Sequence, residues 1–120
     1  MTEEPQNSSY RAQLQFARGN LLVAAKEYEE ATAYFDKALQ IKPDYYDAWC
    51  LKGIALDKLG RYEQALASYD QAVEIKPDYY DAWYNRGNAL DDLGRVINLI
   101  YGAITDGLVA LIYGNAKTFQ

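Results

Sequence analysis

Few side chains in this sequence could do covalent or metal chemistry. Cys50 is the only cysteine among 120 residues, and there is no histidine. This composition excludes histidine-based catalysis, Cys/His zinc sites and an internal disulfide. Apart from Lys52, no cationic group near Cys50 in the sequence would activate its thiol. We therefore expect Cys50 to be a spectator and not a nucleophile.

The carboxylate pairs are no better candidates for catalysis. Glu29–Glu30 and Asp91–Asp92 are sequence neighbours, and neighbours on a helix point about 100° apart. No third ligand accompanies either pair, and the sequence contains no glycine-rich phosphate loop, nucleophile elbow or metal-ligand spacing. We expect solvated carboxylates, no cofactor, no metal and no enzyme activity.

The composition indicates a folded chain of about one domain. Half of the residues are hydrophobic and 24% are charged, which is typical of globular proteins. Twelve Lys and Arg stand against 17 Asp and Glu, giving a net charge of -5. This acidity argues against a nucleic-acid partner.

Neither end of the chain indicates export or membrane insertion. Residues 1–9 are polar and lack the basic and apolar regions of a signal peptide, so we expect a cytoplasmic protein. The most apolar stretch, Val96–Tyr113, is interrupted by Asn98, Thr105, Asp106 and glycines. We therefore expect no membrane association.

The most informative feature of the sequence is an internal repeat of 34 residues. Asp-Tyr-Tyr-Asp-Ala-Trp occurs at 44–49 and again at 78–83, and Ile-Lys-Pro occurs at 41–43 and again at 75–77. One step back along the chain, Gly19 aligns with Gly53 and Phe35 aligns with Tyr69. A repeat of this length predicts stacked supersecondary units.

Each copy has the pattern of two amphipathic helices. In the second copy we expect helices over 44–59 and 61–75, separated by Gly60 and ended by Pro77. Asp44 is expected to cap the first helix, with Asp47 completing a capping box. The short connection predicts antiparallel packing. Glycine and alanine at the interface would let the helices approach closely, and the aromatic residues at helical spacing are expected to fill the core.

The pattern resembles the tetratricopeptide repeat (TPR). It is carried in order by Trp49, Gly53, Leu56, Gly60, Tyr62, Ala65, Tyr69, Ala72 and Pro77. The resemblance implies an all-α, right-handed α-solenoid of antiparallel helix pairs. It divides the chain into a polar tail at 1–9, repeats at 10–43, 44–77 and 78–113, and a tail at 114–120. The basic residue before the glycine, Lys52 in this copy, departs from the family's usual leucine.

The resemblance ends after Arg95, because the third repeat has a non-standard second helix. An apolar stripe predicts a helix over about 96–113: Ile97, Ile100, Tyr101, Ile104, Leu108, Leu111 and Ile112. Strand is the competing interpretation, since glycines weaken helices and Val, Ile and Tyr favour strands. A solenoid end usually has a polar outer face. This apolar end predicts a homodimer through the last helix, or else an altered terminus that only aggregates.

The resemblance further implies a protein–protein interaction module that holds a partner's peptide or helix in a concave groove. The groove positions are Gln13, Phe16, Asn20, Asp47, Cys50, Ile54, Asp57, Asp81, Tyr84, Asn88 and Asp91. Their acidity predicts a basic or amphipathic peptide, although the sequence leaves open whether these aspartates are only solvated or capping residues. The alternative is a self-assembling structural protein or fragment.

Some members of the family clamp acidic tails with lysine, arginine and asparagine. Asn20 matches one clamp position and Asn85 lies nearby, but Phe16 and Leu51 occupy others. We therefore expect no such clamp. Of the doublets Tyr45–Tyr46 and Tyr79–Tyr80, one tyrosine each is expected to pack at a repeat junction.

Overall fold

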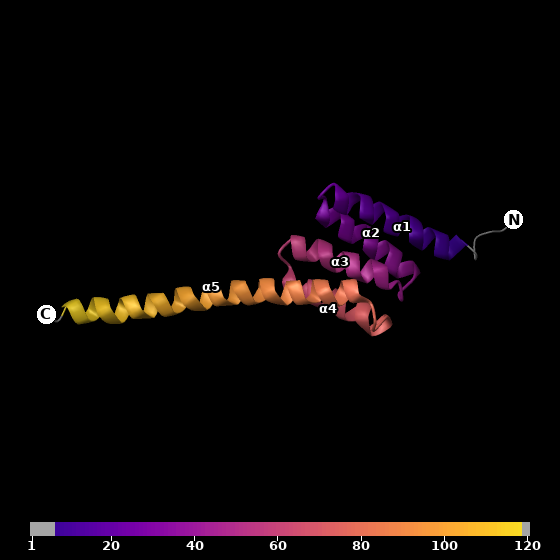
Figure 1. Ribbon diagram of the computed structural model, residues 1–120. Helices are drawn as coiled ribbons and strands as arrows, with labels where there is room; N and C mark the ends of the chain where they lie inside the picture. Colours follow the sequence, from indigo (N-terminus) through magenta and orange to yellow (C-terminus); the bar gives the residue numbers. More distant parts are fainter. Residues whose placement is uncertain (1–6, 119–120) are drawn as a thin grey trace. The chain divides into compact units, whose positions relative to one another are not determined.

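The computed structural model describes the backbone of residues 7–118 and the side chains of residues 8–114. Within that part of the chain every regular element is a helix, in the order α1 Asn7–Ala24, α2 Tyr28–Ile41, α3 Tyr46–Lys58, α4 Tyr62–Ile75 and α5 Tyr80–Thr118 (Figure 1). The prediction of an all-α fold is confirmed. The chain divides into two units, Met1–Leu90 and Asp91–Gln120.

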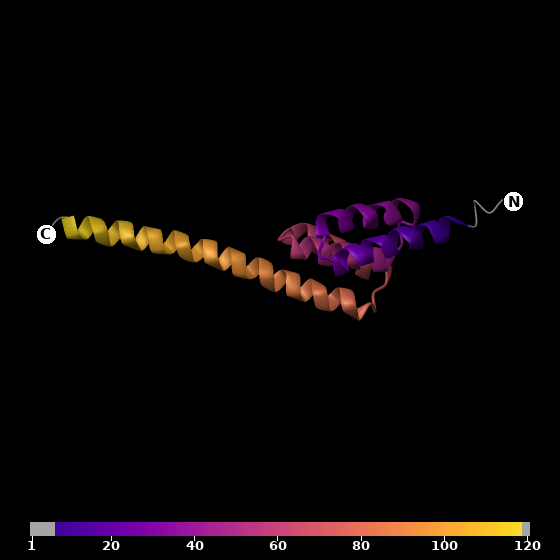
Figure 2. The same ribbon diagram turned by 90° about the horizontal axis from the view of Figure 1, so that it is seen from above.

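In the first unit, the helices form two repeating antiparallel pairs. Helix α2 packs against α1, α4 packs against α3, and α2 also contacts α3 (Figures 1 and 2). The two most deeply buried aromatic rings are those of Phe35 and Tyr69, one in the second helix of each pair. Each is flanked by fully buried alanines of its own helix: Ala31 and Ala38, and Ala65 and Ala72. The helices therefore meet through small residues placed around one large ring, as predicted.

The turn within each pair uses a left-handed residue. Lys26 has φ 63° and Gly60 has φ 79°, and the next N–H donates back into the preceding helix. Those bonds run from Glu27 N to Leu22 O at 2.7 Å and from Arg61 N to Leu56 O at 2.9 Å. Such bonds satisfy the last carbonyls of a helix. Glycine has no steric penalty there, whereas Lys26 carries a small one.

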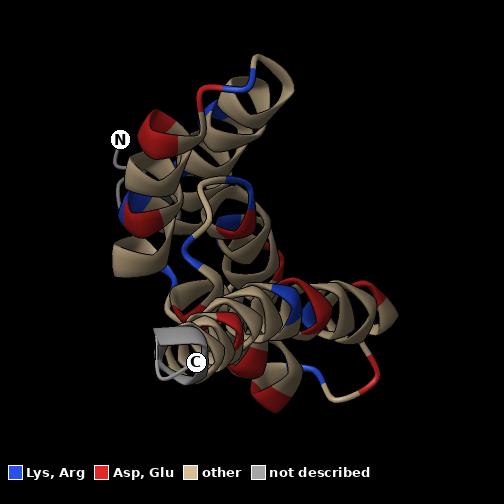
Figure 3. Ribbon diagram, turned by 90° about the vertical axis from the view of Figure 1, so that its left-hand side faces the viewer, with Lys and Arg blue, Asp and Glu red and all other residues tan. Residues whose placement is uncertain are grey.

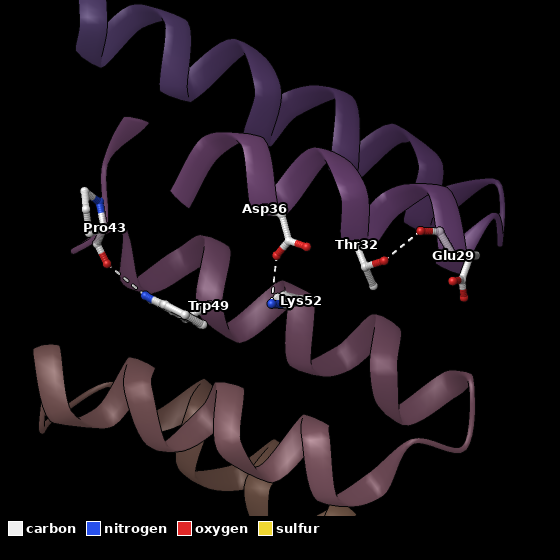
Figure 4. Close-up of polar contacts among 6 residues, drawn as sticks. All are labelled: Glu29, Thr32, Asp36, Pro43, Trp49 and Lys52. Carbon is white, nitrogen blue, oxygen red and sulfur yellow. Dashed lines mark hydrogen bonds and ion pairs between the residues drawn. The ribbon is translucent and has the colours of Figure 1, made fainter. Parts of the chain in front are cut away.

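The junction between pairs is held by tryptophan and not by the expected capping box. Tyr45 is the N-cap residue of α3 and its side chain makes no capping bond, so the prediction for Asp44 and Asp47 is wrong. Instead the Trp49 indole Nε1 donates to the Pro43 carbonyl oxygen at 2.9 Å (Figure 4). The bond recurs 34 residues later, from Trp83 to the Pro77 carbonyl at 2.7 Å. The chain segment before each first helix is thus fixed by a ring from inside that helix.

Ion pairs join successive repeats at equivalent positions. Lys52 Nζ lies 2.7 Å from Asp36 Oδ1, between α3 and α2 (Figure 4). Arg86 Nε lies 2.6 Å from Asp70 Oδ1, between α5 and α4. The basic residues before Gly53 and Gly87, which depart from the family pattern, therefore bridge to the preceding repeat.

Two helices extend into segments that the sequence analysis assigned to tails. Helix α1 begins at Asn7, inside the predicted polar tail 1–9, and α5 is helical to Thr118, inside the predicted tail 114–120. The third repeat also has no separate second helix, because α5 continues through Gly94. Leu99 and Ala103 stand where the second repeat has Ala65 and Tyr69, so the packing that stabilises a turn is missing. The prediction of helix over strand for 96–113 is confirmed.

Candidate partner-binding surface

Most predicted groove residues of the first unit present at least part of their side chains to solvent. Gln13 and Asn20 on α1, and Asp81, Tyr84 and Asn88 on α5, are exposed. On α3, Asp47, Ile54 and Asp57 are half-buried. These residues all belong to first helices of the repeating unit. Tyr84 is 71% exposed, and tyrosine is enriched at protein interfaces because it combines a large apolar ring with a polar tip.

Two predicted groove residues differ from the prediction because they belong to the core. Cys50 is only 2% exposed and therefore offers no surface to a partner. Phe16 is half-buried, with ring centroids 5.9 Å from Phe35 and 4.8 Å from Tyr45. The helix spacing placed both residues correctly on first helices, but the depth of burial depends on the rings of other helices.

Negative charge surrounds the buried thiol of α3. Burial raises the pKa of Cys50 to about 11, and the carboxylates of Asp81 and Asp47 add to the rise. The Tyr79 hydroxyl donates to Asp47 Oδ1 at 2.7 Å. Burial and this hydrogen bond raise the pKa of Tyr79 above its ordinary value. Asp47 therefore accepts a hydrogen bond from the residue just before α5 and also adds negative charge near Cys50. Elsewhere on the helices, charges of both signs occur (Figure 3).

The last predicted groove residue, Asp91, belongs to the second unit. Its Oδ2 lies 2.9 Å from Arg95 Nη2, one helical turn later, and both side chains are largely exposed. An exposed pair at this spacing contributes only a few tenths of a kcal/mol. The Asp91 carboxylate is thus paired with a residue of its own helix.

The two tyrosine doublets differ in how many of their rings pack against other aromatic rings. Tyr79 packs edge-on against Tyr46 with ring centroids 5.1 Å apart, whereas Tyr80 is 82% exposed. In the first doublet both tyrosines pack, since Tyr45 also contacts Phe16. The expected division, with one tyrosine packed and one open, therefore holds only for the second doublet.

Surface hollows occur on the first unit away from the predicted groove residues. One of about 620 Å³ is lined by Lys26, Glu27, Tyr28, Glu29, Glu30, Thr32, Ala33, Asp36 and Leu59. Two smaller ones are lined around Trp49 and Gln64, and around Arg18 and Tyr34. Among the described residues, no group of three or more Cys, Asp or Glu side chains could hold a metal ion.

The predicted self-association residues are all exposed. Every member of the stripe presents more than half of its surface to solvent: Ile97, Ile100, Tyr101, Ile104, Leu108, Leu111 and Ile112. By length and composition alone, the helix over Tyr80–Gly114 would be sufficient to cross a membrane. Length and composition do not decide between a membrane and a protein partner.

Sequence reasoning missed an exposed surface on the first part of α5. Trp83 and Leu90 are nearly half exposed, although their counterparts Trp49 and Leu56 pack in the core. The alignment of repeats already contained the signal. It placed Leu99 and Ala103 where a covering helix would need Ala65 and Tyr69.

Comparison with known families finds the same repeat in two segments. Residues 22–68 match the family model described as tetratricopeptide repeat, and residues 58–94 match one described as TPR repeat. An uncharacterized protein of Methanocaldococcus jannaschii is 37% identical over 51 residues, which cover 42% of this chain and 59% of that protein. The matching segment thus spans less than two thirds of that relative.

Solved structures share the fold over most of this chain. The second TPR of Spaghetti (RPAP3), bound to HSP90 peptide SRMEEVD, has a TM-score of 0.72 at 25% identity, covering 77% of this chain and 85% of that one. The Sgt2 TPR domain from Aspergillus fumigatus has a TM-score of 0.68 at 27% identity, covering 70% and 56%. The Arabidopsis OM64 TPR domain has a TM-score of 0.71 at 20% identity, covering 73% of each chain. The last likeness concerns the fold alone.

Proposed function

Since the chain belongs to the tetratricopeptide repeat family, we propose that it is a protein-interaction module that binds a partner's peptide or helix along its first helices, α1, α3 and the start of α5. The observation that carries the proposal is the exposure of Tyr84 at a predicted groove position. An exposed tyrosine offers a large contact area and a polar tip at little entropic cost. Ile54 adds a half-buried apolar contact on the neighbouring first helix.

We propose a basic or amphipathic partner segment. Burial is the main cause of the raised pKa of Cys50, and the nearby carboxylates of Asp81 and Asp47 add to it; both aspartates therefore place negative charge near the middle of α3. That charge favours cationic side chains and opposes carboxylates. Asp57 contributes a further negative charge on the same helix.

An acidic tail of the kind bound by the Spaghetti domain fits this chain less well. Phe16 and Leu51, which stand at clamp positions, pack around the buried Phe35 ring. The Asn85 amide donates to the Asp81 carbonyl oxygen at 2.8 Å, so it is already engaged within its own helix. No lysine or arginine replaces them among the groove residues.

A matched pair of tyrosine variants tests the proposal. The probe is a labelled peptide of alternating lysine and leucine residues, and its binding is followed by fluorescence anisotropy. Tyr84→Ala should weaken binding by about tenfold or more, as for a central aromatic contact. Tyr80→Ala, which removes a similarly exposed ring outside the groove positions, should leave binding unchanged.

A second pair of variants tests the charge preference. Asp81→Asn should weaken binding of the lysine-containing peptide, mainly at low salt. Asp78→Asn, an exposed site outside the groove positions, is the control. A version of the peptide with glutamate in place of lysine should not bind. Equal binding of the two peptides would contradict the proposed partner chemistry.

A further inference from the structure

The first part of α5 leaves uncovered a surface that the preceding first helices bury. A Cβ built on Gly53 would lie 2.5 Å from Cε1 of Tyr69, whereas one built on Gly87 would meet nothing within 4 Å. Leu56 is 4% exposed, but its counterpart Leu90 is 45% exposed. We call Trp83, Gly87 and Leu90 the open face of α5. These residues are equivalent to those through which α3 contacts α4, but within the described part of the chain α5 has no covering helix at this position.

The two complete pairs define what kind of helix fits such a face. Each covering helix has large, small, large and small residues at intervals of three, four and three. In α2 these are Tyr28, Ala31, Phe35 and Ala38, and in α4 they are Tyr62, Ala65, Tyr69 and Ala72. After Arg95 the pattern occurs once, as Ile104, Gly107, Leu111 and Gly114. All four of these residues are exposed.

Residues 104–114 do not follow the register in which a repeat covers its own first helix. Gly60 makes the turn of the second pair with φ 79°, but Gly94, in the same Leu-Gly-Arg sequence, is helical. Ile104 also stands eight residues beyond the position that the 34-residue period gives the counterpart of Tyr62. A second molecule is the source of the covering helix that this register favours.

We propose that α5 pairs antiparallel with α5 of a second copy, so that residues 104–114 of each copy cover the open face of the other. Leu111 of the second copy takes the place over Gly87 that Tyr69 takes over Gly53. Leu108 of the second copy then lies against Leu90, as Leu66 joins the cluster of Leu56. Because each copy gives and receives the same segment, the arrangement closes as a two-fold dimer.

The spacing of apolar residues along α5 supports this pairing. Gly87, Leu90, Gly94, Ile97, Tyr101, Ile104, Leu108 and Leu111 alternate steps of three and four residues. This heptad spacing is that of one helix seam packed against another. The single charged residue between Val96 and Gly114 is Asp106, which falls outside the seam.

A bilayer fits these residues less well than a second copy. Asp106 lies near the middle of the apolar segment, and a carboxylate at the centre of a bilayer costs about 2.5–3.5 kcal/mol on insertion scales. A membrane would also leave the open face of α5, with its match to residues 104–114, without an explanation.

Cross-linking between two different chains tests the pairing directly. Both chains carry Cys50→Ala; one adds Gly87→Cys and the other adds Leu111→Cys. Mixed under mild oxidation, they should form a disulfide-linked species of twice the 13.6 kDa chain mass, at least tenfold more than either chain alone. A mixture of the Gly87→Cys chain with a Gly102→Cys chain is the control, because residue 102 lies off the seam.

Three results would overturn the proposal. The first is cross-linking of the Gly87/Leu111 mixture no stronger than that of the control mixture. The second is a doubly substituted chain that forms only an internal disulfide, which would show that the segment covers its own molecule. The third is flotation of the wild-type chain with phosphatidylcholine vesicles together with absence of the cross-link, which would assign the apolar residues to a membrane.

A variant that fills the open face gives a second test. Gly87→Leu should convert the dimer to a monomer in light scattering, with helical content unchanged because a side chain there meets no neighbour within the chain. Gly102→Leu, which adds the same bulk off the seam, should stay dimeric. Leu111→Ala added to Gly87→Leu should restore the dimer by returning space to the pair. A Gly87→Leu chain as dimeric as wild type, or a wild type monomeric at about 100 μM, would contradict the pairing.

Discussion

The ring of Tyr69 rests on the backbone of Gly53. A Cβ added to Gly53 would lie 2.5 Å from Cε1 of that ring, and the same distance separates the Phe35 ring from a Cβ on Gly19. Both rings are fully buried. The contact sets the spacing of the two helices in each pair, so its loss should lower the stability of the first unit.

Gly53→Ala is expected to lower the free energy of unfolding by about 1–3 kcal/mol, because the methyl group overpacks against Tyr69. Urea denaturation followed by circular dichroism measures the change. Gly102→Ala is the matched control, since a Cβ there meets nothing within 4 Å. It should be neutral, or stabilising by up to about 1 kcal/mol through helix propensity. Equal destabilisation by both variants would contradict the packing described for Gly53.

Trp49→Ala is expected to cost about 3 kcal/mol or more in unfolding free energy, since the ring packs against two core clusters. Trp49→Phe keeps much of the bulk but loses the bond from Nε1 to the Pro43 carbonyl, and should cost about 1 kcal/mol. Thermal and urea unfolding of the two variants separate the contributions. A normally stable Trp49→Ala protein would show that the ring does not hold the junction.

The Lys52–Asp36 ion pair is expected to couple successive repeats weakly. A double-mutant cycle with Lys52→Met and Asp36→Asn should give about 0.5–1 kcal/mol, because the Lys52 side chain is only 23% exposed. The Asp91–Arg95 pair, exposed on both sides, serves as the control and should give less. The Lys52–Asp36 coupling should fall as salt is raised. A coupling energy of zero at low salt would show that this ion pair does not help to join successive repeats.

Cys50 is expected to resist alkylation near neutral pH. Burial raises its pKa to about 11, so the reactive thiolate is scarce and shielded. Iodoacetamide should label the native chain slowly at about pH 8 and rapidly in urea, as followed by mass spectrometry. Fast labelling of the native chain would show that the thiol is accessible.

The same shift has a consequence for stability at high pH. The pKa of Cys50 is higher in the folded state than in the unfolded state. The protonated thiol therefore contributes fully to the free energy of unfolding below the ordinary thiol pKa, and this contribution is lost as the pH rises towards about 11. Cys50→Ala should therefore lose less unfolding free energy than wild type between about pH 8 and pH 10.5. An identical loss in both proteins would assign the alkaline destabilisation to other groups such as Tyr79, whose pKa is also raised.

The sequence was sufficient to predict the helix pairs because their determinants are local and repeated. Gly53, Ala65 and Tyr69 recur at equivalent positions, and the period alone indicated which faces meet. The exposed groove residues Tyr84 and Asn88 were placed on a first helix by the same period.

The features that the sequence did not predict depend on contacts between distant segments. Leu-Gly-Arg turns at Gly60 but continues as helix at Gly94. Ala65 and Tyr69 follow the first copy, whereas Leu99 and Ala103 stand at the equivalent positions after the second. Cys50 is buried because it lies in a cluster with Tyr69, Tyr79 and Ala82, which helix spacing cannot show. Asp44 is not the cap of α3, since the Trp49 indole holds the preceding proline instead.

The most direct test of partner binding along the first helices is an NMR titration of the ¹⁵N-labelled chain with the lysine–leucine peptide. Chemical-shift changes should concentrate at the exposed groove positions Asn20, Tyr84 and Asn88, and at half-buried Ile54. Positions of the second helices such as Glu30 and Gln71, both exposed, should change little. Shifts concentrated on α2 and α4, or no shifts at any peptide concentration up to about 1 mM, would contradict the proposed function.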